Sequence, residues 1–183
     1  MLSEEEEIQQ MNDFENIPRV DPHEFNKVRV RTMKDVSRRA NKCRCEPEVL
    51  VVDDNDFNIF PVKLMLKELY NIDIHSASNG QIAVDMFKER WSNKCKCKNR
   101  VFRLIIMDIS MPVMDGIKAS NLILKLQNAQ RYDEELTHIV ALTAHTNKEY
   151  ITKCKAVGMK DVYNKPLIQD DLKLIMARHY FRQ

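Results

Sequence analysis

Three aspartates, a threonine and a lysine lie at the ends of short apolar segments, and together they carry the side chains that phosphoryl transfer needs. They are Asp53, Asp54, Asp108, Thr143 and Lys165. Crowded carboxylates repel one another, and a hard divalent cation with oxygen ligands relieves that repulsion. Mg²⁺ suits these positions better than Zn²⁺, because neither His nor Cys stands at them. A carboxylate nucleophile, Mg²⁺, an ammonium and a hydroxyl are the groups required for phosphoryl transfer to an aspartate.

The elements that must position these side chains alternate along the chain from about residue 48 as short apolar runs and longer amphipathic stretches. The predicted strands are 48–54, 72–78, 101–108, 137–144 and 160–165, and the predicted helices are 56–70, 80–91, 115–130, 147–158 and 166–180. This alternation predicts a doubly wound α/β fold with a parallel sheet. Side chains at the carboxyl ends of such strands converge on one crevice, so the five residues are expected to meet there.

A carboxylate after a strand has a second interpretation, as the N-cap of the helix that follows. We expect that role for Asp56 and Asp115, each of which precedes an amphipathic stretch. Helix capping does not account for Asp54, Asp108, Thr143 and Lys165 as a set, because it explains neither the hydroxyl nor the lysine. The set therefore favours a site.

Four segments resemble, in order and context, the receiver domains of two-component response regulators and of hybrid histidine kinases. They are VLVVDDNDFN, LIIMDISMPVMDG, IVALTAH and NKP, and the resemblance covers about residues 47 to 181. It is strongest to the C-terminal receiver of a hybrid histidine kinase. The resemblance implies a flavodoxin-like (βα)5 domain over 47–183, with strand order 2-1-3-4-5 and helices on both faces of the sheet.

The resemblance also implies a role for each site residue. Asp108 would accept a phosphoryl group from a phosphohistidine of a histidine kinase or a histidine phosphotransfer protein. Asp54 would bind Mg²⁺ directly and Asp53 through water, with Asp108 and the backbone carbonyl of Ser110 as further ligands. Lys165 would pair with the phosphoryl oxygens, and Thr143 would swing inward and pull the following loop with it. Such a domain is not an enzyme beyond its own phosphorylation and slow dephosphorylation.

The sequence departs from the family at the position three residues before the lysine. The family usually has an aromatic side chain there, whereas this chain has Val162 followed by Tyr163. Strand neighbours point to opposite faces, so Tyr163 is not a substitute without a change of register. The departure affects how the phosphorylation site would be coupled to the face formed by the fourth helix, fifth strand and fifth helix. A downstream protein is expected to bind to that face.

Ser110 and His145 each lie two residues beyond a site residue, within reach of a phosphoryl group and its attacking water. We expect them to tune the phosphoryl lifetime. His145 is either a general base or an exposed histidine at the rim of the site. Two other functions stay open: a protein-interaction module that does not switch, and an aspartyl-phosphate phosphatase. The latter would need a second carboxylate where Ser110 stands.

Composition gives no sign of a nucleic-acid or membrane partner, because 29 basic residues face 27 acidic ones. No apolar run approaches the roughly 18 residues of a membrane span, and the start MLSEEEE is unlike a signal peptide. We therefore expect a cytoplasmic protein. The chain stops soon after the fifth predicted helix, so no DNA-binding domain is expected. Either a stand-alone receiver or a piece of a hybrid kinase would fit.

Residues 1–46 lack the strand and helix rhythm and are predicted to be a charged, partly disordered extension. Its basic segment, 27–44, is either solvated or a docking segment for an acidic partner.

Two Cys-x-Cys pairs lie at matching distances before the first and third predicted strands. They are Cys43 with Cys45 and Cys95 with Cys97. Four thiolates brought together at the amino-terminal edge of the sheet could hold Zn²⁺. A disulfide and four free thiols are the alternatives.

Overall fold

The computed structural model describes residues 47–92, 101–129, 137–144 and 148–181. Within these ranges the chain forms one parallel five-stranded sheet in the order β2-β1-β3-β4-β5. The strands are β1 (Val49–Val52), β2 (Ile74–Ala77), β3 (Leu104–Asp108), β4 (His138–Thr143) and β5 (Asp161–Asn164). The predicted strand order is confirmed.

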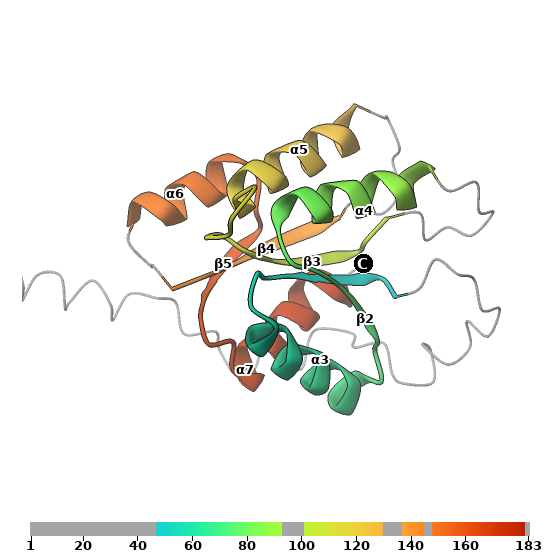
Figure 1. The fold of residues 1–183 in the computed structure, drawn as a ribbon. Coiled ribbons are helices and arrows are strands. Elements are labelled where there is room, and N and C mark those ends of the chain that lie inside the picture. The colour runs from blue at the N-terminus through green and yellow to red at the C-terminus, as the bar shows by residue number, and fades with distance from the viewer. Residues whose placement is uncertain (1–46, 93–100, 130–136, 145–147, 182–183) are drawn as a thin grey trace, which may run out of the picture. The chain divides into compact units, whose positions relative to one another are not determined.

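In the described ranges, five α-helices connect or follow these strands. They are α3 (Asp56–Tyr70), α4 (Gly80–Ser92), α5 (Gly116–Asn128), α6 (Lys148–Ala156) and α7 (Gln169–Ile175), and α7 runs on into the π-helical turn η2 (Met176–Tyr180). Helices α4, α5 and α6 cover one face of the sheet, and α3 and α7 cover the other (Figure 1). The last helix begins later than predicted, because residues 166–168 form the connection that leaves β5.

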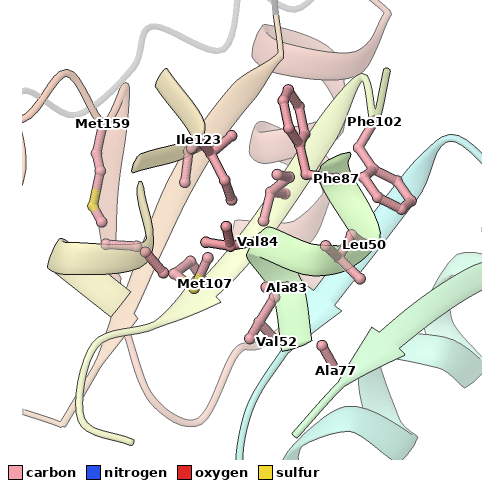
Figure 2. Close-up of a cluster of buried hydrophobic side chains, with 14 of the residues drawn as sticks. Leu50, Val52, Ala77, Ala83, Val84, Phe87, Phe102, Met107, Ile123 and Met159 are labelled. Atoms are coloured by element: carbon pink, nitrogen blue, oxygen red, sulfur yellow. The ribbon is translucent and has the colours of Figure 1, made fainter. Parts of the chain in front are cut away.

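The interior strands β1 and β3 are buried along their whole length, as expected for a sheet covered on both faces. Alternate side chains point to opposite faces. Leu50 and Val52 therefore pack in one hydrophobic cluster, and Val49 and Val51 pack in the other. Figure 2 shows the first cluster, in which helix side chains such as Phe87 cover the sheet. Both clusters fix the strands whose ends carry the candidate site.

Polar side chains start the two helices that follow site-bearing strands. Asp115 is the N-cap of α5 and accepts a hydrogen bond from Lys118 N at 2.7 Å, so this capping prediction is confirmed. The corresponding prediction for Asp56 is wrong: the N-cap of α3 is Asn55, whose side chain accepts from Phe57 N. Asp56 instead occupies the first turn, where a negative charge favours the positive end of the helix dipole.

Gly116 lets α5 start directly against the end of β3. Its N–H donates to Ile109 O at 3.0 Å, and a Cβ at this position would lie 2.0 Å from the backbone oxygen of Asp108. Any side chain would push the helix away from the strand end.

Several predictions fall on residues outside the described ranges. These are the N-terminal extension 1–46 with its basic segment, the position of His145, and the zinc site at Cys43, Cys45, Cys95 and Cys97. Nothing in the described part of the chain supports zinc, and the free cysteine found there, Cys154, is buried. Across these same ranges, no helix combines the length and apolar character needed to cross a membrane.

Candidate functional site: an acidic pocket at the carboxyl edge of the sheet

The carboxyl edge of the sheet brings together the five residues that the sequence singled out. Asp53 directly follows β1, Asp108 is the last residue of β3, and Thr143 is the last of β4. Strand register aligns Asp108 with Leu142 and Thr143 with Asn164, so neighbouring strands end at nearly the same level. A backbone hydrogen bond of 2.9 Å from Lys165 N to Thr143 O ties the end of β5 to that of β4.

Three carboxylates form the centre of the pocket. Asp53, Asp54 and Asp108 can each offer one oxygen so that all three lie within 4.8 Å of one another. Asp53 and Asp108 are only 1% and 3% exposed, whereas Asp54 is exposed. This set of oxygen donors, part buried and part open to solvent, is what Mg²⁺ requires, because Mg²⁺ prefers carboxylates and retains water ligands. The residues present therefore fit Mg²⁺.

Lys165 bridges the two buried carboxylates. Its Nζ lies 2.6 Å from Asp53 Oδ2 and 2.8 Å from Asp108 Oδ2. The ammonium thereby compensates part of the negative charge, and its position beside Asp108 would also suit an added anionic group. Among the described residues, no hydrogen-bond donor approaches Asp53 Oδ2 with good geometry apart from this ion pair.

Burial and charge act in opposite directions on these groups. Burial raises the pKa of Asp108 and outweighs the hydrogen bond and charge of Lys165, which lower it, while the negative charge of Asp53 raises it further. For Lys165, burial lowers the pKa, but the two carboxylates more than reverse this, so its pKa lies above the ordinary value. Lys165 is therefore a fixed positive charge, and Asp108 depends on it to ionise.

The other oxygen of Asp53 has a separate role that sequence reasoning missed. Asp53 Oδ1 accepts hydrogen bonds from Asn55 N at 3.0 Å and from Asn58 Nδ2 at 2.9 Å. The signal was available in DDNDFN, since a donor in the first helical turn can reach back to the strand end, but it depends on where the helix starts.

Ser110 and Thr143 lie in this pocket with different degrees of burial. Ser110 is exposed and its N–H donates to Asp108 Oδ1 at 3.3 Å, which places its backbone beside the Asp108 carboxylate. Thr143 is 2% exposed, and it lies buried at the same edge of the sheet. The metal-ligand role of the Ser110 carbonyl and the inward swing of Thr143 stay predictions.

Val162 and Tyr163 face opposite sides of the sheet, as strand alternation predicted. Val162 packs against the cluster beneath α4, α5 and α6, and Tyr163 against the cluster beneath α3 and α7. Burial raises the pKa of Tyr163 to about 12, assisted by the charge of Asp161. On the α6 side of β5, where the family usually has an aromatic side chain, this chain has Val162.

The fold and the pocket together define a class of α/β protein. Its doubly wound sheet carries a buried aspartate, two further carboxylates and a lysine at its carboxyl edge, and these residues form an acidic pocket that fits a cation. The chain belongs to the response regulator receiver domain family, whose sequence pattern matches residues 49–177. It is a receiver domain of two-component phosphorelay signalling.

Two similar proteins are hybrid histidine kinases of Dictyostelium discoideum. The chain is 36% identical over 138 residues to hybrid signal transduction histidine kinase G of Dictyostelium discoideum, covering 73% of this chain and 4% of that protein. It is 38% identical over 127 residues to hybrid signal transduction histidine kinase F of the same organism, covering 68% of this chain and 10% of that protein. The chain thus spans a tenth or less of the length of these relatives.

Solved receiver structures share the fold. The receiver domain of the histidine kinase CKI1 from Arabidopsis thaliana, complexed with Mg²⁺ and BeF3⁻, matches with a TM-score of 0.61 and 25% identity, covering 71% of this chain and 89% of that one. The Saccharomyces cerevisiae complex of the histidine phosphotransfer protein Ypd1 with the Ssk1 receiver domain matches with a TM-score of 0.58 and 29% identity, covering 73% and 93%.

Proposed function

We propose that Asp108 is the phosphoacceptor of this domain and that its donor is a phosphohistidine on a histidine kinase or a histidine phosphotransfer protein. An Asp108 carboxylate oxygen attacks phosphorus, and a P–O bond forms as the P–N bond to the imidazole breaks. The electron pair of that bond stays on the imidazole nitrogen, which then takes a proton. The observation that carries the proposal is a buried strand-end carboxylate held 2.8 Å from the Lys165 ammonium within an acidic pocket.

The surrounding groups compensate the charge that this reaction concentrates. Mg²⁺, when bound, neutralises phosphoryl oxygens and aligns them for in-line attack. Asp54 and Asp108 would hold it directly, with Asp53 through water and the Ser110 carbonyl as a further ligand. Lys165 exchanges part of its contact with Asp108 for the phosphoryl oxygens, which keeps a positive charge beside the transferred group.

Phosphorylation would act as a switch by changing the balance of charge in the pocket. It replaces one negative charge by about two and adds strong hydrogen-bond acceptors. The Thr143 hydroxyl, buried at the same edge, gains a new partner and draws in the loop after β4, which shifts an existing population of states. Val162 supplies no bulky ring to follow that movement, which favours a weaker response on the α6, β5 and α7 face, where a downstream protein would bind.

The donor protein must cover the rim of the pocket to bring its phosphohistidine to Asp108. Large apolar side chains are exposed on the segments that follow the site residues: Phe57 is 86% exposed, Phe60 60%, Ile168 56% and Val113 81%. Phe57 and Phe60 lie in the first turns of α3, directly after Asp54, and Ile168 follows Lys165 by three residues. Such exposed apolar groups around a polar pocket are suited to docking a protein.

The phosphatase alternative loses support at Ser110. A hydrolase that works through an aspartyl phosphate needs an acid/base carboxylate there, and the side chain present is an exposed hydroxyl. The non-switching interaction module keeps one supporting observation, the packing of Val162 in the core where the family has an aromatic.

The test is incubation of the full chain with acetyl phosphate and Mg²⁺, followed by intact-mass measurement. Wild-type protein is expected to gain one phosphoryl group and Asp108→Asn none. Asp54→Ala should weaken Mg²⁺ binding about 100-fold or more and slow the reaction accordingly, because a unit charge near 4 Å is worth about 4 kcal/mol at a partly shielded site. A wild-type chain without an adduct, or an adduct kept by Asp108→Asn, would sink the proposal.

A further inference from the structure

We infer that Asn58 is a positioning residue for the cation site: its side-chain amide fixes the orientation of Asp53 so that one carboxylate oxygen is left for the metal's hydration shell. This rests on the proposed function, because it explains how the pocket is prepared for Mg²⁺. The observation that supports this inference is that the two carboxylate oxygens of Asp53 have different partners.

Asp53 Oδ1 is saturated by two donors from the start of α3. Asn55 N lies 3.0 Å and Asn58 Nδ2 2.9 Å from that oxygen. Asp53 Oδ2 has the Lys165 ion pair at 2.6 Å and accepts no well-aligned hydrogen bond from the described residues. Asp53 is 1% exposed, so an Oδ1 that rotated away from these two donors would lose both hydrogen bonds without gaining water in their place. The two donors therefore oppose rotation of the carboxylate.

The start of α3 explains why an asparagine serves at this position. Asn55 is the N-cap, so Asn58 is the third residue of the helix, and its own N–H donates to Asn55 O at 2.9 Å. In a capping box this third residue is Glu or Gln and its side chain accepts from the N-cap N–H. Here Asp53 accepts from the N-cap N–H instead, and Asn58 supplies a donor.

A carboxylate at residue 58 would add a negative charge beside Asp53, whereas the amide adds none. The Asn58 amide must present its nitrogen to Asp53, because the amide oxygen cannot donate to a carboxylate. The start of α3 therefore does two things: Asn55 caps the helix, and Asn55 N and Asn58 Nδ2 donate hydrogen bonds to Asp53 in the pocket.

The experiment compares Mg²⁺ binding by isothermal titration calorimetry among variants of the full chain. Asn58→Leu keeps the size of the side chain but removes the donor, and Asn58→Gln keeps a donor on a longer arm. Asn79 provides a matched control: it is another half-buried asparagine at a helix start, and its side-chain Oδ1 accepts a hydrogen bond from Ile82 N of that helix. Asn79→Ala tests the effect of losing a helix cap.

We expect Asn58→Leu to weaken Mg²⁺ binding about tenfold, at the lower end of what loss of a ligand-orienting partner causes, because Asn55 N still holds Oδ1. Asn58→Gln should recover at least half of that loss, and Asn79→Ala should leave Mg²⁺ affinity within about twofold of wild type. Equal Mg²⁺ affinity in wild type and Asn58→Leu, or no recovery in Asn58→Gln, would overturn the inference.

A measurement on the wild-type chain guards against a variant that does not fold. The side-chain amide signals of Asn58 in a ¹H–¹⁵N spectrum should move during Mg²⁺ titration, while those of Asn79 stay in place. An unmoved Asn58 signal at saturating Mg²⁺ overturns the inference. If wild type binds Mg²⁺ but is not phosphorylated by acetyl phosphate, the proposed function fails while these comparisons still decide the role of Asn58.

Discussion

In the proposed reaction Asp108 must be ionised to attack phosphorus, yet the burial that shields its carboxyl from water works against its ionisation. Burial raises the pKa of the carboxyl, and Asp53 beside it raises the pKa further. Lys165 opposes both effects through a hydrogen bond and its charge. Lys165 thus favours the ionised form of the proposed nucleophile, and under the proposed function the same lysine would also pair with the phosphoryl oxygens.

This arrangement predicts that the site reduces stability at neutral pH. An acid whose folded-state pKa is raised contributes stability below its unfolded pKa and loses that contribution as pH rises through its folded pKa. Asp108→Asn removes the ionisation, so in Mg²⁺-free buffer at pH 7 its free energy of unfolding should exceed that of wild type by roughly 0.5–2 kcal/mol.

Urea denaturation at several pH values measures this difference. The gap between Asp108→Asn and wild type should shrink as pH falls through the raised folded-state pKa of Asp108, because the folded wild-type chain then carries a neutral carboxyl at this position. A variant that is less stable than wild type at pH 7 would contradict this account. Ser110→Ala, a change at an exposed neighbour, serves as the control and should stay within about 0.5 kcal/mol of wild type.

At the scale of elements, the start of α5 is set by the space that Gly116 leaves open. A Cβ on residue 116 would meet Asp108 O at 2.0 Å and Met107 Cγ at 2.9 Å. Gly116→Ala should therefore lower the free energy of unfolding by about 1–3 kcal/mol, because the helix must retreat from the strand end.

The same retreat should slow phosphorylation by acetyl phosphate even under conditions where the variant stays folded. Circular dichroism with urea gives the stability, and intact mass over time gives the rate. Ala119→Gly, one turn further along α5, would also destabilise the helix but leaves the contact with Asp108 intact. If Gly116→Ala were as stable and reactive as wild type, the close packing of α5 on β3 would not be what positions Asp108.

The exposed face of α3 allows docking to be separated from chemistry. Phe57→Ser with Phe60→Ser removes two exposed rings, so stability should change by no more than about 0.5 kcal/mol per site. Phosphorylation by acetyl phosphate, which needs no docking surface, should be unchanged. Transfer from a phosphorylated histidine phosphotransfer protein should slow by about tenfold or more, since exposed aromatic anchors contribute strongly to protein association.

The rate of phosphoryl transfer can be measured by quenching the reaction at successive times and analysing the products by gel electrophoresis or mass spectrometry. Leu122 and Leu126, exposed on α5 away from the strand ends, offer a matched pair for a control double serine variant. Equal slowing by both double variants would point to a general effect of surface polarity, and unaffected transfer would exclude α3 as the docking face.

At the scale of the whole molecule, local patterns were enough to predict the alternating strands and helices of a parallel sheet and the convergence of the five site residues. The order of the strands came from the resemblance to receiver domains, and the structure has that order. The opposite placement of Val162 and Tyr163 also followed from strand alternation. Contacts between distant segments left no such signal. Tyr180 donates to Glu48 Oε2 across 132 residues at 3.2 Å, and only the completed fold brings the C-terminal turn to the start of β1.

The amino-terminal edge of the sheet, opposite the acidic pocket, anchors that C-terminal turn through a second set of polar contacts. His138 at the start of β4 donates from Nδ1 to His179 O at 3.0 Å. His179 Nε2 lies 2.8 Å from Asp161 Oδ2 at the start of β5, with Arg178 at 3.6 Å from the same oxygen. Strands β4 and β5, which end at the acidic pocket, therefore both begin in contacts with η2.

These contacts predict that stability falls in mildly acidic solution. Burial lowers the pKa of His138, and the charges of His179, Lys160 and Arg103 add to the effect. The unfolded chain then binds more protons than the folded one below about pH 6.5, so stability is lost as pH falls from 7 towards the folded-state pKa. The hydrogen bond from His179 lowers the pKa of Asp161, whose contribution is lost only in more acidic solution, below about pH 4.

Between pH 7 and 5 the free energy of unfolding should therefore drop by about 1–2 kcal/mol, and His138→Asn, which keeps a donor near Nδ1, should reduce that drop. Urea denaturation at pH 7, 6 and 5 measures both. Burial and Arg90 also lower the pKa of His75, so His75→Asn is the necessary comparison. If the free energy of unfolding of His138→Asn fell with pH as much as that of wild type, while that of His75→Asn did not change, the pH dependence would come from His75 on β2. The contacts of the C-terminal turn would then have no part in it.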